Sequence, residues 1–256
     1  MQLIRYQKGD EIYYGYLDGD AVGMIEGEVF GPTAHMRGPR VALLSEVKLL
    51  PPCQPSKVIG IVNNFVDRSR EKGEAPPELP LFFFKPPSTV IGPEATIQLP
   101  PQSQRVEYGA ELALVIGKRA RWVTLEEANH YILGYTCTND VTARDVWEQE
   151  GGWARGKSFD TFCPLGPCIV TGLDPADLRV TSVVNEGTRQ MNSTRDIVFS
   201  MPQLVAFLSS VMTLLPGDVI LTGTPSGAGV ITAGDVVEVE IEGIGKLRNP
   251  VAAEEH

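Results

Sequence analysis

The stretch VEYGAELALVIG, Val106–Gly117, places two acids at the start of a run that is typical of a buried strand. Side chains alternate across a strand, so positions 107, 109 and 111 would share one face, with about 6.8 Å between successive Cα atoms on that face. Leu112 and Leu114 would point the other way, into a core. The pattern predicts a buried strand with Glu107 and Glu111 along one face.

A carboxylate at Glu111 would be costly to bury without a partner, because the residues that follow it are apolar. Hard divalent cations are natural partners for such a group. The alternative is that Glu111 lies in water at the strand end or meets an arginine. Asp140 is a second candidate oxygen ligand, since it lies in YTCTNDVTARD, Tyr135–Asp145, where a strand would end and a turn begin.

Length and charge narrow the function classes. The chain has 256 residues, enough for one large domain or for a main domain with a small one beside it. Its formal net charge of -10 argues against nucleic acid and against an anionic membrane surface as partners, since both need basic patches. A small-molecule substrate fits better. The sequence has no signal-like start and no apolar run near the roughly 20 residues of a membrane span, so we expect a cytoplasmic protein.

The chain divides into a short and a long part. Residues 1–52 alternate short apolar and polar runs with Gly/Asp turns, which predicts a small β-rich N-terminal domain. A Pro-rich linker, LLPPCQPSK, leads into a main domain over 53–256. The cysteines have no C-x-x-C spacing, so we interpret them as reduced packing residues: Cys53, Cys137, Cys163 and Cys168.

Two helices and one strand have readable signals in the main domain. Thr124 followed by Glu127 is a capping box, as is Ser200 followed by Gln203. In GDVVEVEIEG, 234–243, valine and isoleucine alternate strictly with glutamate, which predicts a strand whose glutamates face solvent. Most of the remaining segments have the pattern of strands and turns. The fold class is therefore α+β and β-dominated.

Two glycine-containing turns carry polar residues. Lys157 lies in GKSFDTFCPLGP and Thr224 lies in LTGTPSGAG. Such turns let backbone N–H groups approach a ligand, although an ordinary tight turn explains either one equally well. The turn LTGTPSGAG is not a phosphate-binding P-loop, because the Gly-Lys-Ser/Thr ending is missing from it.

Taken together, these segments resemble the fumarylacetoacetate hydrolase family. The motifs FFFKPPSTVIGP, VEYGAELALVIGK, GYTCTNDVTARD, GKSFDTFCPLGP, LLPGDVILTGTPSGAG and GDVVEVEIEGIGKLRN occur in the family's order over about residues 55–250. The resemblance implies a roll of mixed β-sheets, a homodimer, and one Mg²⁺ or Mn²⁺. It also implies 2-oxo acids or 1,3-dicarbonyl compounds as substrates, as in 2-hydroxyhepta-2,4-diene-1,7-dioate isomerase and 5-carboxymethyl-2-oxo-hex-3-ene-1,7-dioate decarboxylase.

The resemblance also implies roles for individual residues. Glu111 and Asp140 would hold the metal, which would act as a Lewis acid on a substrate enolate. Lys157 would add fixed positive charge or shuttle a proton. Arg144 would bind a substrate carboxylate, although an ion pair with Asp145 or Glu148 is its simpler explanation. The remaining substrate-binding positions are Lys85, Thr224, Trp147 and Arg68.

The chain departs from the family pattern at the metal site. A Glu-x-Glu pair is usual on the strand, and here its first position is Gly109. Magnesium commonly keeps several waters and uses one or two carboxylates, so Glu111 and Asp140 remain a possible site. Glu107, where the family usually has aspartate, is a candidate substitute ligand, although the distance along the strand opposes this role.

A second departure is in NNFVDRSREKG, Asn63–Gly73, which corresponds to the family's lid helix. Hydrolytic members carry there a His three residues before a Glu, as the base for water. Here these positions are Arg68 and Glu71, and a guanidinium stays protonated. A third departure is Trp147, which replaces a common glutamine and should reshape the carboxylate end of the pocket.

No histidine is at a position that matches the family's base; the three are His35, His130 and His256. Isomerisation needs enolate stabilisation and a proton shuttle, which Lys157 or Glu71 would supply, whereas hydrolysis needs an activated water. We therefore expect an isomerase or decarboxylase of 2-hydroxy-dienoates or 2-oxo-diacids, as in aromatic-compound catabolism. An acylpyruvate-type hydrolase and a member that binds oxo-acids without turnover are the alternatives.

Overall fold

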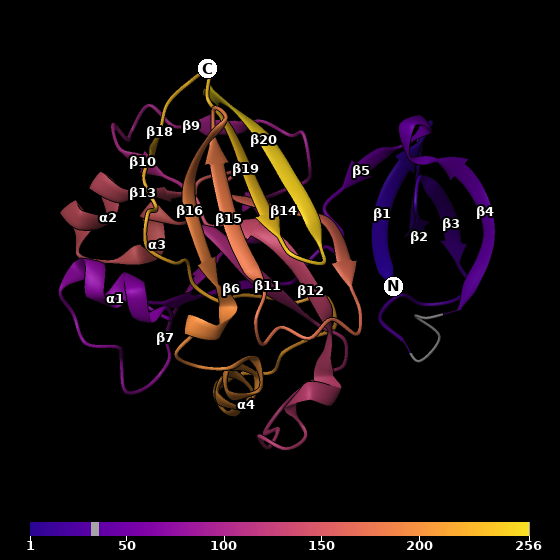
Figure 1. Ribbon diagram of the computed structural model, residues 1–256, viewed down its shortest axis with the longest axis horizontal. Coiled ribbons are helices and arrows are strands. Elements are labelled where there is room, and N and C mark those ends of the chain that lie inside the picture. The colour runs from indigo at the N-terminus through magenta and orange to yellow at the C-terminus, as the bar shows by residue number, and fades with distance from the viewer. Residues whose placement is uncertain (32–35, 256) are drawn as a thin grey trace.

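A computed structural model describes residues 1–31 and 36–255, and strands dominate it. Strands β1–β5 form a lobe beside the main body, which carries the remaining strands and the α-helices (Figure 1). The expected β-dominated α+β fold is confirmed. The division at residue 52 stays a prediction; it falls between β5, which ends at Leu50, and β6, which begins at Val58.

The largest sheet continues from the lobe into the body. Its order is β4-β3-β2-β1-β14-β12-β11-β17-β6-β7, with β5 on β1 and β8 on β14. Its strands are β1 (Gln2–Lys8), β2 (Glu11–Asp18), β3 (Ala21–Ile25), β4 (Arg37–Leu43), β5 (Lys48–Leu50), β6 (Val58–Val62), β7 (Leu81–Lys85), β8 (Val90–Ile91), β11 (Ala110–Ile116), β12 (Ile132–Asn139), β14 (Cys163–Val170) and β17 (Val219–Leu221).

Two smaller sheets and short helices complete the body. The three-stranded sheet joins β10 (Val106–Glu107), β13 (Thr142–Ala143) and β18 (Val230–Ile231). The five-stranded sheet joins β9 (Ile97–Leu99), β15 (Arg179–Val184), β16 (Gly187–Ser193), β19 (Val236–Ile241) and β20 (Gly245–Ala253). The helices are α1 (Val66–Lys72), α2 (Arg144–Glu150), α3 (Trp153–Gly156) and α4 (Met201–Val211), with 3₁₀ turns η1 (Leu44–Glu46), η2 (Pro87–Thr89), η3 (Ala128–Tyr131) and η4 (Thr194–Asp196).

Strand β11 is buried on both faces, as its apolar run predicts. Leu112 and Leu114 pack in one hydrophobic cluster, while Ala113 and Val115 pack in another on the opposite face. The strand pairs with β12 on one side and β17 on the other. It is therefore an interior strand of the sheet, which explains why its apolar residues are nearly continuous.

The expected single strand over 106–117 is wrong at Tyr108 and Gly109. Strand β10 ends at Glu107 and pairs with β13 and β18 in the three-stranded sheet, whereas β11 begins at Ala110 in the large sheet. The Tyr108 N–H donates to Gly229 O at 2.9 Å, and Asp140 N–H donates to Gly109 O at 2.8 Å. These contacts hold the break in place, so Glu107 and Glu111 do not follow one regular strand face.

One of the two predicted helices forms. The Ser200 and Gln203 capping box is present at the start of α4, where Gln203 Oε1 accepts from Ser200 N at 2.8 Å. The helix predicted after Thr124 is wrong, because Thr124 and Glu127 contact each other at 3.2 Å but the segment forms only the 3₁₀ turn η3.

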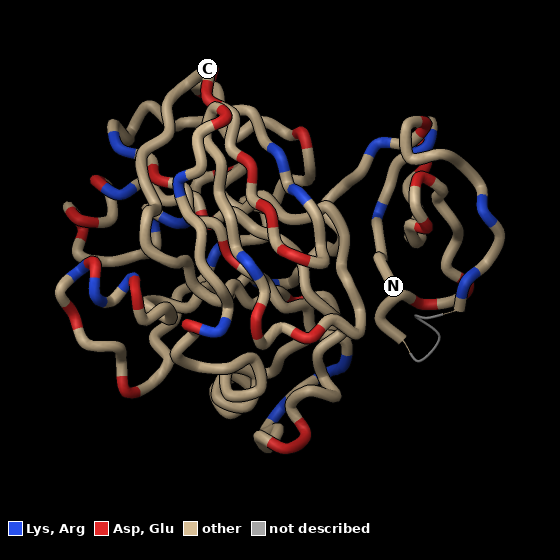
Figure 2. Tube along the Cα trace, viewed as in Figure 1, with Lys and Arg blue, Asp and Glu red and all other residues tan. Residues whose placement is uncertain are grey.

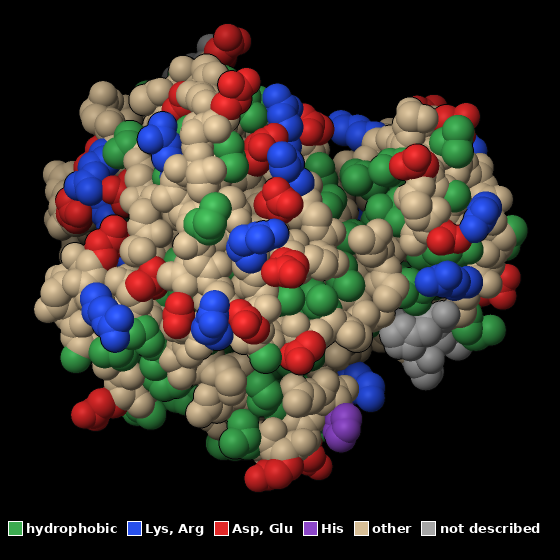
Figure 3. Space-filling model, viewed as in Figure 1, with side chains coloured by type: hydrophobic (Ala, Val, Ile, Leu, Met, Phe, Trp, Pro, Cys, Tyr) green, Lys and Arg blue, Asp and Glu red, His purple; other side chains and the backbone are tan. Residues whose placement is uncertain are grey.

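The strand predicted in GDVVEVEIEG is β19, and its alternation is confirmed. Val237, Val239 and Ile241 are buried. Glu238 accepts from Lys246 on β20 at 2.9 Å, and the acidic residues of β19 lie beside the basic residues of β20 (Figure 2). Acidic and basic side chains are interspersed over the same side of the molecule in Figure 3.

All four cysteines are free and buried, as expected for packing residues. Among the described residues, no helix is long and apolar enough to cross a membrane.

Candidate active site

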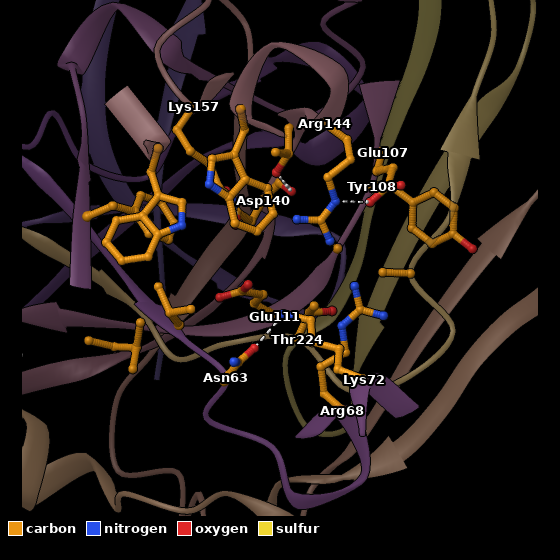
Figure 4. A pocket seen from close by; sticks show the side chains of 18 residues that line it. Asn63, Arg68, Lys72, Glu107, Tyr108, Glu111, Asp140, Arg144, Lys157 and Thr224 are labelled. Carbon is orange, nitrogen blue, oxygen red and sulfur yellow. Dashed lines mark hydrogen bonds and ion pairs between the residues drawn. The ribbon is translucent and has the colours of Figure 1, made fainter. Parts of the chain in front are cut away.

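A pocket lies where β6, β7, β11 and β12 meet the short helices α1, α2 and α3 (Figure 4). Eight of the predicted site residues line it: Arg68, Glu107, Glu111, Asp140, Arg144, Trp147, Lys157 and Thr224. Lys85 lies behind Asp140, and Glu71 lies on the exposed side of α1. Segments that are distant in sequence therefore converge on one cavity.

Asp140 at the pocket floor is paired with two buried lysines. Lys85 Nζ donates to Asp140 Oδ1 at 2.5 Å and to Val141 O at 2.8 Å, and Lys157 Nζ pairs with Asp140 Oδ2. Burial opposes ionisation of Asp140, but the two lysines outweigh it and the pKa of this carboxyl is lowered. The structure thus brings Lys85 and Lys157 together on Asp140.

Glu111 is almost fully buried beside this cluster. Its Oε2 accepts from Gly223 N at 2.7 Å. Burial and then the charge of Asp140 raise the pKa of the Glu111 carboxyl well above its usual value, while Lys157 opposes the shift. Gly223 has a φ of 94°, and a Cβ there would lie 3.0 Å from Asn64 Cβ, so glycine is what lets this backbone N–H reach Glu111.

Glu107 and Arg144 meet on the pocket wall. Arg144 Nε donates to Glu107 Oε2 at 3.1 Å, and Arg105 contacts the other oxygen at 2.7 Å. Arg144 also lies 3.7 Å from Glu148 and stacks 4.0 Å above the ring centroid of Trp147. The ion pair that α2 offers is therefore present, and Glu107 adds a second partner that sequence reasoning did not identify for Arg144.

Helix α1 covers one side of the pocket and is anchored to the glycine-rich turn. Asp67 accepts from Ser226, and Gly227 N donates to Glu71 Oε1 at 3.2 Å. Arg68 pairs with Glu71, so the two positions to which the family resemblance assigns a His and a Glu form an ion pair here. An arginine in that pair supplies charge and no base.

Thr224 faces the empty position left by Gly109. Its hydroxyl donates to Ala110 O at 2.9 Å and accepts from Gln190 Nε2 at 2.8 Å. A Cβ at position 109 would lie 3.3 Å from Thr224 atoms, so a side chain there would have to displace Thr224 slightly. Gly109 lines the pocket, so a carboxylate side chain at this position would lie in the pocket.

The donor set does not fit a three-carboxylate cation centre. Among the described residues, no group of three or more His, Cys, Asp or Glu side chains is placed to hold a metal ion. Glu111 and Asp140 are the two carboxylates at the floor, and both oxygens of Asp140 contact lysines. Both oxygens of Glu107 contact arginines, so its role as a substitute ligand stays a prediction.

Histidine plays no part in the pocket as described. His130 lies in η3, outside the residues that line it. His35 and His256 lie outside the described residues.

Sequence reasoning missed several pocket residues. Lys72 and Asn63 line the pocket and contact each other at 2.5 Å, and Phe83 and Trp153 form an apolar wall. Lys157 Nζ lies 4.4 Å from the Phe83 ring centroid. A lysine one turn after Arg68 on the same helix was a readable signal for Lys72, whereas nothing local in the sequence marks Phe83 or Trp153.

Comparison with known proteins identifies two family models that match the chain. The family described as fumarylacetoacetate (FAA) hydrolase C-terminal matches residues 57–252, and one described as Rv2993c-like, N-terminal, matches residues 1–52. The mitochondrial oxaloacetate tautomerase of Xenopus laevis is 43% identical over 220 residues, covering 81% of this chain and 69% of its own.

Two solved structures show the same fold. The 5-carboxymethyl-2-hydroxymuconate delta-isomerase of Mycobacterium smegmatis is 41% identical with a TM-score of 0.91, covering 99% of this chain and 100% of its own. The maleylpyruvate hydrolase of Sphingobium sp. SYK-6, solved with manganese(II) and pyruvate, is 31% identical with a TM-score of 0.82, covering 100% of both chains. Enzymes of this family generally use divalent metals. The chain belongs to the fumarylacetoacetate hydrolase family.

Proposed function

We propose that this chain is an enol–keto isomerase of 2-oxo acids, acting on 2-hydroxy-dienoate or 2-oxo-diacid substrates. One observation carries the proposal. The Lys157 ammonium is buried on Asp140 at the pocket floor, while the lid position of the hydrolytic base is occupied by Arg68. This arrangement supports stabilisation of an enolate, and no histidine among the described residues lines the pocket to activate water.

The reaction needs no redox partner and no leaving group. The enol O–H bond breaks as its proton passes to solvent, and the enolate that remains carries one negative charge. A C–H bond then forms at the neighbouring carbon with a proton from the Lys157 ammonium, which solvent protonates again. Lys157 Nζ donates to the enolate oxygen and supplies fixed positive charge. Asp140 holds Lys157 in place, and Lys85 holds Asp140 from behind. Phe83 and Trp153 form an apolar wall beside Lys157.

Two relatives support an isomerisation. One is named a tautomerase of oxaloacetate and the other an isomerase of a hydroxymuconate. Decarboxylation of an oxo-diacid passes through the same enolate and is the second candidate. The Mg²⁺ or Mn²⁺ implied by the family stays a prediction for this chain, as do the homodimer and the cytoplasmic location.

The test is an absorbance assay of oxaloacetate enol–keto interconversion, with pyruvate release measured in parallel to detect decarboxylation. We expect Lys157→Met to lower the rate about 100-fold or more, because it removes the charge at the enolate oxygen. Lys118→Met, which changes an exposed lysine outside the pocket, is the matched control. A rate of acylpyruvate hydrolysis higher than the rate of enol–keto interconversion would favour the hydrolase alternative. Binding of oxalate without any turnover would favour the non-catalytic one.

A further inference from the structure

Three cations line the pocket on the side of the lid helix. Arg68 and Lys72 come from α1 and Arg144 begins α2. The side chains of Arg68 and Arg144 are each 13% exposed. Their guanidinium groups point toward one another across the cavity (Figure 4). In a chain with a net charge of -10, this convergence of positive charge calls for an anionic ligand.

The cations repel one another in the structure as described. Burial lowers the pKa of Lys72, and the charges of Arg68 and Arg144 lower it further, against Glu74 and Glu71. An anion placed between these groups would relieve the repulsion that they now experience.

The neighbouring glutamates do not use all the N–H donors of Arg68 and Arg144. Arg144 contacts Glu107 and Glu148 through Nε alone, and Arg68 contacts Glu71 through Nη1. Within the described residues, no hydrogen bond or ion pair involves the Nη groups of Arg144 or Nη2 of Arg68, although the Arg144 guanidinium stacks on the Trp147 ring. Guanidinium groups bind carboxylates through paired N–H donors, and these donors remain free for that purpose.

We propose that Arg68 and Arg144, with Lys72 beside them, bind the second carboxylate of a dicarboxylic 2-oxo acid whose oxo-acid end lies at Lys157. The proposal rests on the proposed function, and it assigns Arg68 a role in choosing the substrate. A monocarboxylic 2-oxo acid would leave the two guanidinium groups facing each other without an anion. The lid helix is therefore the element that distinguishes a dicarboxylate from a monocarboxylate.

The experiment is calorimetric titration of pyruvate, oxaloacetate, 2-oxoglutarate and 2-oxoadipate into the native chain, Arg68→Met and Arg70→Met. Arg70 lies on the same helix but is exposed and does not line the pocket, so it is the matched control. In the native chain, we expect the tightest dicarboxylate to bind at least about 10-fold more tightly than pyruvate. Arg68→Met should reduce that ratio to less than about threefold and leave pyruvate binding within about twofold.

Other outcomes separate the two proposals. Equal binding of pyruvate and every dicarboxylate by the native chain overturns the subsite, as does an equal loss for both ligand classes in Arg68→Met. Dicarboxylate binding that depends on Arg68, together with no pyruvate binding and no isomerase activity, supports the subsite and overturns the proposed function. Binding of none of the four acids overturns both. A loss of preference in Arg70→Met would show that the lid as a whole, and not Arg68, sets the selectivity.

Discussion

Asp67 and Ser226 join the lid helix to the glycine-rich turn. The Ser226 hydroxyl and backbone N–H donate to Asp67 Oδ2 at 2.6 and 3.0 Å, and Asn192 donates to the same oxygen. One carboxylate oxygen thus holds α1 against two segments that lie far away in sequence. The position of Arg68, one residue further along, depends on this anchor.

Asp67→Ala should loosen the lid. Amide hydrogen exchange over residues 66–73 should quicken by about tenfold or more, because the hydrogen bonds that hold the first turn are lost. Exchange in β11 should stay unchanged. Ser226→Ala, which removes one of these donors and keeps the backbone N–H, should give a smaller increase. Unchanged exchange in both variants would contradict the anchoring role.

Gly109→Glu should increase the affinity for Mn²⁺. Position 109 lines the pocket beside Thr224, so a carboxylate there would join Glu111 and Asp140 as a third acidic ligand. We expect the dissociation constant measured by calorimetry in the presence of oxalate to fall at least about tenfold. Gly109→Gln has the same size without the charge and should show no such gain.

Tight Mn²⁺ binding by the native chain would contradict this prediction, and Glu107→Gln shows which residues are then the ligands. Tight Mn²⁺ binding by the native chain that Glu107→Gln abolishes would show that Glu107 leaves its arginines and acts as the substitute ligand. Tight binding unaffected by either variant would show that Glu111 and Asp140 suffice.

Arg68→His should introduce hydrolysis of acylpyruvates. Arg68 and Glu71 already contact each other, so an imidazole at this position would lie within reach of a carboxylate that orients it as a base. Loss of the 1,3-dicarbonyl enol absorbance measures the reaction. Arg68→Gln supplies neither base nor charge and should show no gain. Equal rates in both variants would mean that a histidine on α1 is not sufficient.

Asp145 should make stability depend on pH at the acid end. Burial opposes its ionisation, but hydrogen bonds from Ser103 Oγ, Gln104 N and Val146 N outweigh this and lower the pKa of its carboxyl. A lowered folded-state pKa contributes stability that is present above the unfolded value, about 3.9, and is lost as pH falls through the folded value.

Urea unfolding between pH 2 and pH 7 tests this linkage. The free-energy difference between the native chain and Asp145→Asn should be constant above about pH 5 and should shrink below about pH 4. Asp160→Asn, an exposed position, should follow the native curve throughout. A difference that grew toward low pH would have the wrong sign for this mechanism.

The sequence predicted the fold better than the shape of the pocket. The run from Leu112 onward indicates a strand covered on both faces, and the alternation in β19 indicates one covered on a single face. The motifs that resemble the family brought Lys157, Asp140 and Glu111 to one site. The strand patterns are local, and the family motifs are recognised by their order along the chain. Neither kind of signal requires knowledge of the contacts between distant segments.

What could not be predicted depends on contacts between distant segments. The break at Tyr108 and Gly109 is held by Gly229 and Asp140, and neither partner is visible in a strict alternation of residues. The capping box at Thr124 formed without a helix, because a favourable local cap does not decide a segment of one turn. Lys72 was missed because its relevance comes from Arg68 and Arg144 together.

The pairing of β1 with β14 also bears on solubility. Gln2 and Leu3 pair with Val170 and Ile169, so the N-terminal lobe covers one edge of a strand that would otherwise end the sheet of the main body. Open strand edges are templates for pairing with other chains. A substitution that unfolds the lobe would leave the pocket's own residues in place and yet expose that edge. Aggregation, rather than altered chemistry, would then be the first sign of damage to residues 1–50.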